Sequence, residues 1–460
     1  MLEKVQNMFK IPELRRRILF TLGILAVYRL GCHLPTPGID ASALAQFFEA
    51  QRGTILGMID MFSGGALSKL TVFALGIMPY ISASIILQLL IVVVPYLEKL
   101  SKEGEAGKKK ITMYTRYGTA VLSMLQGFGI GMWMEKMTSP SGVPIVIHPG
   151  LGFKLLTMLT LTAGTAFIMW LGEQISERGI GNGISLIIFA GIIARLPSAI
   201  IQTGNQVIQG ELKIYTTIVL VALMVGVVAL VVVLQQAQRR LPIQHAKRVV
   251  GRKLYGGQST YLPLRVNMAG VIPPIFASSI IMFPATAVGI FGASFLDPVV
   301  AQLSPGRLLY VVLEVAAIIF FCYFYTSIIF NPTDVADNLR KSGANIPGKR
   351  AGKATADYID EVLSRLTFGG GIFLAGICVL PGVLVYGIPL ADIPFIGERA
   401  AGWFPYYLTH GLGVPFWFGG TALLIVVGVA LDTVQQIEAQ MIMRHYEGFV
   451  KKGKLRGRRS

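Results

Sequence analysis

The chain has 460 residues and a net charge of +17, yet only 14% of its residues are charged, whereas an average soluble domain has about 25%. Hydrophobic residues make up 53% of it and the mean hydropathy is +0.63, so the composition excludes an ordinary soluble protein. Apolar runs of about 18 or more residues recur along the whole length and indicate a polytopic α-helical membrane protein.

The apolar runs predict ten membrane spans, each near the ~20 residues that cross a bilayer. They cover approximately residues 18–35, 72–96, 113–134, 153–173, 184–202, 214–234, 268–290, 308–329, 367–387 and 415–434. The first span is expected to be retained, because no Ala-x-Ala-like cleavage site follows its basic start. An even number of spans places both termini on one side, where the loops carry 32 of the 41 Lys and Arg residues. The positive-inside rule therefore predicts that both termini are cytoplasmic.

The segment 57–67, GMIDMFSGGAL, lies just before the second predicted span and differs from the other loops. It carries one charge, Asp60, and a glycine pair, Gly64 and Gly65, among Met, Ile and Phe residues. It is too short and too broken to cross a bilayer, and too apolar for an ordinary outer loop. Irregular backbone at membrane depth is tolerated where protein or water surrounds it, and such a position would suit this segment.

Basic residues gather in two long loops and in the C-terminal tail, 435–460. Alternating residues in the loop 235–267 predict a strand hairpin, with the pair Gly256-Gly257 as its turn. The loop 330–366 is the second. Two interpretations stay open: such loops set topology and touch anionic lipid, or they dock an acidic partner such as ribosomal RNA or a protein.

Motifs of catalysis and cofactor binding are not found in the sequence. There is no phosphate-binding P-loop and no nucleophile elbow, and the five histidines are scattered. We therefore expect no enzyme, no cofactor and no metal. The three cysteines, Cys32, Cys322 and Cys378, have no metal-ligand spacing and are expected to be small buried hydrophobes.

Two other classes of membrane protein compete with a channel. A secondary transporter for a small solute needs ionisable groups near the midplane. Arg29 is expected to snorkel from the outer end of the first span, and Glu173 and Glu314 are the other candidates. The spans 72–96 and 268–290 contain no charged residue, which counts against ion coupling. A scaffold without a pore is the remaining alternative.

Five motifs resemble those of the SecY family, the central channel subunits of bacterial protein translocases. They are FALGIMPYISASIILQLL (73–90), GEQISERGIGNGISLIIFAGI (172–192), YGGQSTYLPLRVNMAGVIP (255–273), NPTDVADNLRKSG (331–343) and FGGTALLIVVGVALDT (418–433). The resemblance implies an all-α membrane fold of ten helices in two pseudo-symmetric five-helix halves, 1–205 and 206–460. It also implies a channel that passes unfolded secretory polypeptides across the bacterial plasma membrane and releases transmembrane segments sideways into lipid.

The resemblance also assigns site residues. Segment 57–67 matches the family's plug, a short re-entrant helix that blocks the resting pore, with the residues Met58, Ile59, Asp60, Met61, Phe62, Ser63, Gly64 and Gly65. Matching positions of the narrow pore ring are Ile77, Ile81, Ile184, Ile188, Ile275 and Ile425. The lateral gate, between the spans 72–96 and 268–290, would contain Ser82, Gln88 and Ser279. Partner-docking residues would be Arg248, Arg252 and Arg350.

The expected partners follow from the same resemblance. They are the SecE and SecG subunits, the SecA motor ATPase, the ribosome with its RNA, signal sequences and nascent chains, and anionic lipids. The loop around Arg350 departs from the family at Lys349 and Ala351, which bears on the stiffness of that loop. The outer segment 388–414 is longer than the family leads us to expect and receives no function.

Overall fold

A computed structural model describes residues 11–50, 60, 63–139, 142–210, 213–245, 248–250, 253–255, 259–291, 297–304, 306–387 and 420–452. Its helices are α2 (Pro12–Gly31), α3 (Ala41–Ala50), α5 (Met78–Val93), α6 (Pro95–Lys102), α7 (Glu105–Glu135), α8 (Leu151–Arg178), α9 (Gly183–Ile193), α10 (Leu196–Ile208), α11 (Ile214–Gln236), α12 (Ile272–Phe291), α13 (Asp297–Gln302), α14 (Leu308–Ile329), α15 (Pro332–Lys341), α16 (Lys353–Tyr386) and α19 (Gly420–Lys452). Its strands are β1 (Gln238–His245), β2 (Arg248–Val250), β3 (Lys253–Tyr255), β4 (Ser259–Arg265) and β5 (Ala344–Asn345).

The all-α membrane architecture is confirmed. Each of the ten predicted spans overlaps a helix. Within the described ranges, six helices are long and apolar enough to cross a membrane, or seven if the bent pair α5 and α6 is one span. Cys32, Cys322 and Cys378 are free and buried, as expected for small hydrophobes.

The predicted span 72–96 is wrong at both ends. Residues 72–77 form turns, and α5 begins only at Met78. Gly76 has a φ of +55°, which is not a helical conformation. The proline in the first turn of α5 has no backbone N–H, so it cannot bond to a helical turn before it, and the helix begins there. At the other end, Val94 is extended in front of Pro95, and the chain bends by 100° into α6.

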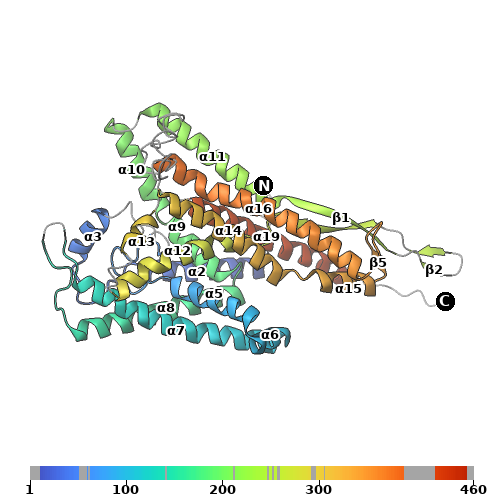
Figure 1. Ribbon diagram of the computed structural model, residues 1–460, viewed down its shortest axis with the longest axis horizontal. Helices are drawn as coiled ribbons and strands as arrows, with labels where there is room; N and C mark the ends of the chain where they lie inside the picture. The colour runs from blue at the N-terminus through green and yellow to red at the C-terminus, as the bar shows by residue number, and fades with distance from the viewer. Residues whose placement is uncertain are drawn as a thin grey trace. The chain divides into compact units, whose positions relative to one another are not determined.

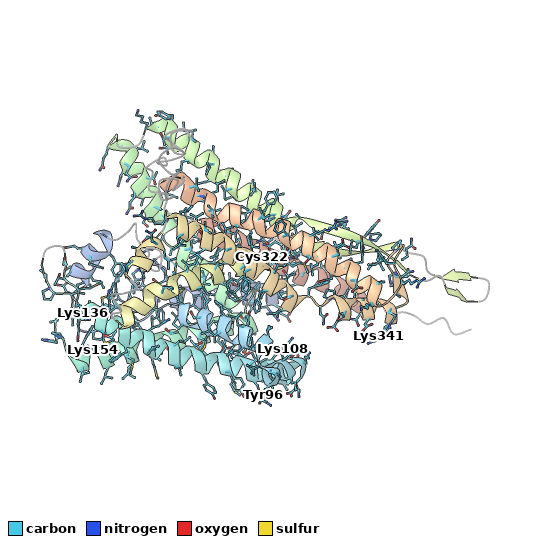
Figure 2. All side chains as sticks on the ribbon, in the orientation of Figure 1. Tyr96, Lys108, Lys136, Lys154, Cys322 and Lys341 are labelled. Atoms are coloured by element: carbon cyan, nitrogen blue, oxygen red, sulfur yellow. The ribbon has the colours of Figure 1, made fainter. Side chains whose placement is uncertain are left out.

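The chain divides into two compact units. Unit 1 comprises Met1–Thr203, Met282–Ala301 and Val429–Ser460, and unit 2 comprises Gly204–Ile281 and Gln302–Gly428. In unit 1, α7 packs along α8 (Figure 1), and the labelled Lys108 and Lys136 mark the two ends of α7 (Figure 2). The arrangement as two five-helix halves, 1–205 and 206–460, stays a prediction.

Small residues explain how closely α7 approaches α8. Gly127 and Gly131 are four residues apart and therefore share one helix face. A Cβ on either glycine would lie 3.2 Å from a backbone Cα of α8, at Met158 and Lys154 respectively. Larger side chains at these positions would push the helices apart, as is typical of glycines at helix contacts in membranes.

An apolar cluster in unit 1, which we call the α3 cluster, joins α3 to the chain that follows the segment 57–67. Leu44, Leu70 and Leu161 are fully buried in it. Its other buried members are Ala43, Phe48, Leu67, Ala74, Leu75, Met134, Ile145, Val146 and Phe153. The chain between residues 67 and 75 therefore packs against α3 before α5 begins.

In unit 2, the two long basic loops form one structure, which we call the basic lobe: β1, β4, β5, α15 and the first turns of α16. β4 pairs antiparallel with one edge of β1 and β5 with the other. An apolar core of Leu241, Leu264, Ile346, Ile359 and Val362 lies beneath them. Figure 1 shows β1, β5 and α15 gathered at the start of α16.

The strand hairpin predicted in 235–267 is confirmed. β2 pairs with β3 so that Val250 faces Lys253. The residues between these two strands lie outside the described residues, and so does the predicted turn pair Gly256-Gly257.

Candidate functional site

The described part of the segment 57–67 folds onto itself around Asp60. The Ser63 hydroxyl donates to the Asp60 carbonyl at 2.9 Å and accepts from the Leu67 N–H at 3.2 Å. The Gly65 N–H also donates to the Asp60 carbonyl, at 2.9 Å. Gly64 and Gly65 have φ values of +68° and +84°, which only glycine adopts without strain. Met58, Ile59, Met61 and Phe62 lie outside the described residues.

Two arginine side chains help to hold this turn. Arg195, just after α9, donates through Nη2 to Asp60 Oδ2, and the Ser68 N–H donates to Asp60 Oδ1 at 2.8 Å. Arg29, near the end of α2, donates to the Gly64 carbonyl at 3.0 Å. Arg29 therefore binds a backbone oxygen 35 residues away, and its snorkelling to the membrane surface stays a prediction.

The turn also approaches α9 very closely. A Cβ on Gly64 would lie 2.8 Å from the Gly191 Cα, nearer than such atoms come in proteins. A Cβ on Gly65 would lie 3.2 Å from Arg195 Nη2, so the guanidinium lies against the glycine backbone. We call Arg29, Gly191 and Arg195 the cradle of this turn.

Sequence reasoning missed Gly191 and Arg195. The only signal was a charge imbalance: one acid in an apolar segment, and one cation between two apolar helices. A buried carboxylate needs a partner, since an unpaired charge is costly to remove from water. Asp60 is 4% exposed, so the sequence could have posed the question of its partner but not answered it.

Four predicted ring residues belong to unit 1. We expected Ile77 to lie inside a helix, but it is the N-cap residue of α5. Its carbonyl accepts from the Ile81 N–H at 3.1 Å. Ile184 and Ile188 share one face of α9. Ile184 is half-buried and Ile188 is buried. A Cβ on Gly76 would lie 3.5 Å from the Ser63 Cα, so the turn around Asp60 lies beside the start of α5.

Ile275 on α12 and Ile425 on α19 are the ring residues of unit 2, and both are buried. The ring as a whole stays a prediction. So does the lateral gate, whose Ser82 and Gln88 are on α5 in unit 1 and whose Ser279 is on α12 in unit 2.

Two polar side chains of the predicted gate, Gln88 and Ser279, bond within their own helices. The Gln88 amide donates to the Ser84 hydroxyl at 3.2 Å, while its Oε1 is buried without a partner among the described residues. The Ser279 hydroxyl donates to the Ile275 carbonyl at 2.7 Å. Neither of these two bonds joins α5 to α12.

The predicted docking arginines fall on or beside the basic lobe. Arg350 is exposed in the turn before α16, and its carbonyl accepts from the Thr355 hydroxyl at 2.8 Å. Lys349 lies over the Tyr358 ring, 5.0 Å from its centroid, which steadies this turn. Arg248 begins β2, and Arg252 lies outside the described residues. The docking role of all three stays a prediction.

Comparison with known proteins gives a consistent result. Residues 71–434 match the family model described as SecY. Protein translocase subunit SecY of Escherichia coli strain K12 is 50% identical over 451 residues, covering 97% of this chain and 96% of the relative.

Solved structures agree on the fold. One is described as showing that the plug domain of the SecY protein stabilises the closed state of the translocation channel and maintains a membrane seal. It matches with a TM-score of 0.64 and 18% identity, covering 93% of this chain and 92% of that one. Sec61 in a canine ribosome–channel complex from the endoplasmic reticulum matches with a TM-score of 0.61 and 15% identity, with the same coverage. At these identities the likeness establishes the fold alone.

Proposed function

The chain belongs to the SecY family, and we infer that it is the channel subunit of a bacterial protein translocase. It passes unfolded secretory polypeptides across the inner membrane, in which it is a multi-pass protein, and releases transmembrane segments into lipid. It carries out no chemistry of its own, and the SecA motor or the ribosome supplies the energy of transport.

One observation carries this assignment: an apolar, glycine-hinged turn sits in a built cradle directly before a membrane helix. Asp60 is 4% exposed and paired with Arg195, and Gly64 lies against Gly191. Irregular backbone of this kind is tolerated at membrane depth when it is buried in protein or lines water. We therefore interpret the segment 57–67 as the plug of the resting pore.

The six isoleucines form the narrow point of the proposed pore. A ring of aliphatic side chains repels water and so blocks hydrated ions, yet offers a passing chain no hydrogen bonds. A signal sequence would leave sideways between α5 and α12, where Ser82, Gln88 and Ser279 lie. Because the amide of Gln88 and the hydroxyl of Ser279 bond within their own helices, parting α5 from α12 breaks neither of these bonds.

The basic lobe is the docking surface in this proposal, and it faces the cytoplasm with both termini. Arg248, Arg252 and Arg350 would contact the ribosome, including its RNA, or SecA, and SecE and SecG would complete the membrane complex. Clustered cations attract acidic partners and anionic lipid headgroups over a distance of about 8 Å at physiological salt. The structure described for canine Sec61 includes a ribosome, which supports this choice of partner.

Single-channel conductance in planar bilayers tests the assignment. The intact complex should be tight, and the same complex lacking residues 58–66 should pass large ion currents. If both forms stay silent, the segment is not a plug and the channel assignment falls. Saturable uptake of a small solute by the intact protein would then favour the transporter.

A further inference from the structure

We propose that Asp60 and Arg195 form a charge latch that holds the plug in its resting position, with Arg29 and Gly191 completing the seat. This inference rests on the proposed function, since it assigns positioning residues to the plug. Arg195 lies 135 residues from Asp60 along the chain and comes from the turn between α9 and α10.

Both oxygens of the Asp60 carboxylate accept hydrogen bonds in the latch. Oδ2 accepts from Arg195 and Oδ1 from the Ser68 N–H, so both oxygens of Asp60 have a donor. The Asp60 side chain is 6% exposed and that of Arg195 is 30% exposed. The pair therefore has one end in protein and the other near solvent. Arg195 also follows the C-terminus of α9, where the helix dipole favours a cation.

The seat is shaped as well as charged. Only glycine fits at position 64, because the turn there has a positive φ and the Gly191 backbone leaves no room for a Cβ. Arg29, on α2, donates to the Gly64 carbonyl. It precedes the turn in the chain, whereas Arg195 follows it. Two cations and one glycine contact thus fix the turn at Asp60, at Gly64 and at Gly65.

Charge contacts suit a plug that must leave its seat. A carboxylate and a guanidinium that separate into water are each rehydrated, so much of the lost attraction is recovered. Removing only one partner has a different effect, because the other charge stays in a seat built for its counter-ion. Asp60→Asn or Arg195→Gln should therefore unseat the plug, whereas a variant that keeps the charge should largely preserve the seat.

The test is the open probability of the resting complex in planar bilayers. Asp60→Asn and Arg195→Gln should each raise it by about tenfold or more, the usual worth of a hydrogen bond to a charged group. Arg195→Lys, which keeps the cation, should stay nearer the wild-type value than Arg195→Gln. The matched control is the Glu135–Lys154 pair, 2.9 Å apart in the same unit with 14% and 22% exposure. Glu135→Gln with Lys154→Gln should leave the current unchanged.

The dependence of the open probability on salt is a second measurement, and it should not change if Asp60 has only a structural role. Raising the ionic strength screens the partly exposed pair, so the wild-type open probability should rise with salt and that of Asp60→Asn should not. Wild-type currents from both neutral variants overturn the latch, and so does an Arg195→Lys variant that is as leaky as Arg195→Gln. If the 58–66 deletion nevertheless opens the channel, the proposed function stands without the latch. If the deletion is silent, the proposed function itself falls.

Discussion

The cradle around Asp60 and the basic lobe are both small structures at helix ends, but different forces hold them. The turn at Asp60 is fixed by an ion pair, one bond from Arg29 and a contact between two glycines. The lobe is fixed by seven residue pairs between β1 and β4 and by an apolar core in which Leu264 and Ile359 are fully buried.

This difference in forces suits the turn at Asp60 to movement and the basic lobe to keeping one conformation. Polar contacts can be exchanged for water at modest net cost, whereas buried apolar area is lost outright when a core opens. The cradle is thus suited to release its turn during each transport event, and the lobe to keep its shape while a partner binds. Three substitutions test this contrast and a fourth, at Asp40, gives a reference outside both regions; they follow in order of decreasing expected effect.

Replacing Gly64 by Val should abolish the seal. The new Cβ would lie 2.8 Å from the Gly191 Cα, and both atoms belong to or adjoin backbone, so neither can give way. We expect resting currents close to those of the 58–66 deletion, measured in planar bilayers. Gly142→Val is the control, because Gly142 also has a positive φ, +80°, but nothing within 4 Å of a new Cβ. Equal leakage from both variants would contradict the role of the contact.

Replacing Ile359 by Ala should damage the lobe without opening the channel. Truncation of a fully buried isoleucine removes about 2–5 kcal/mol of stability. Faster proteolysis of the loop 235–267 and weaker ribosome or SecA binding should follow, with a resting conductance like the wild type. Tyr261→Ala, at a position 59% exposed on β4, is the matched control. A leak from Ile359→Ala would show that the lobe and the seal are not separate.

Replacing Arg350 by Ala should change docking and leave folding alone. Its side chain is exposed, so stability should shift by no more than about 0.5 kcal/mol. The association rate with the ribosome or SecA should fall, most clearly at low salt, because a rim charge acts mainly on the encounter. Lys341→Ala removes an equally exposed charge from α15 and serves as the control. If the two variants slow binding equally, only the total charge matters.

The smallest effect is expected at Asp40, in front of α3. Hydrogen bonds from Ser42 and Ala43 hold the pKa of its carboxyl below the usual value. A lowered folded pKa gives stability that is present above the unfolded pKa of about 3.9 and is lost as pH falls through the folded value. Asp40→Ala should therefore lower Tm slightly at pH 7, and the difference from wild type should vanish in acid. A constant difference across pH would contradict this role of the carboxylate.

The sequence by itself determined the class of protein and the order of its elements. Hydrocarbon excludes unpaired backbone, so each span must be a helix of about 20 apolar residues, and such runs can be recognised locally. Alternation in the loop 235–267 likewise predicted strands. The errors at Ile77 and at Pro95 arose where glycine and proline interrupt an apolar run that hydropathy alone treats as continuous.

Only the tertiary structure decided which distant residues meet. Asp60 with Arg195, Gly64 with Gly191, and β5 on the free edge of β1 join segments from about 100 to 135 residues apart. No local period encodes such pairs, because each depends on how whole helices pack and where their ends fall. The sequence shows that Asp60 is a lone acid in an apolar turn, and packing decides that an arginine at the end of α9 neutralises it.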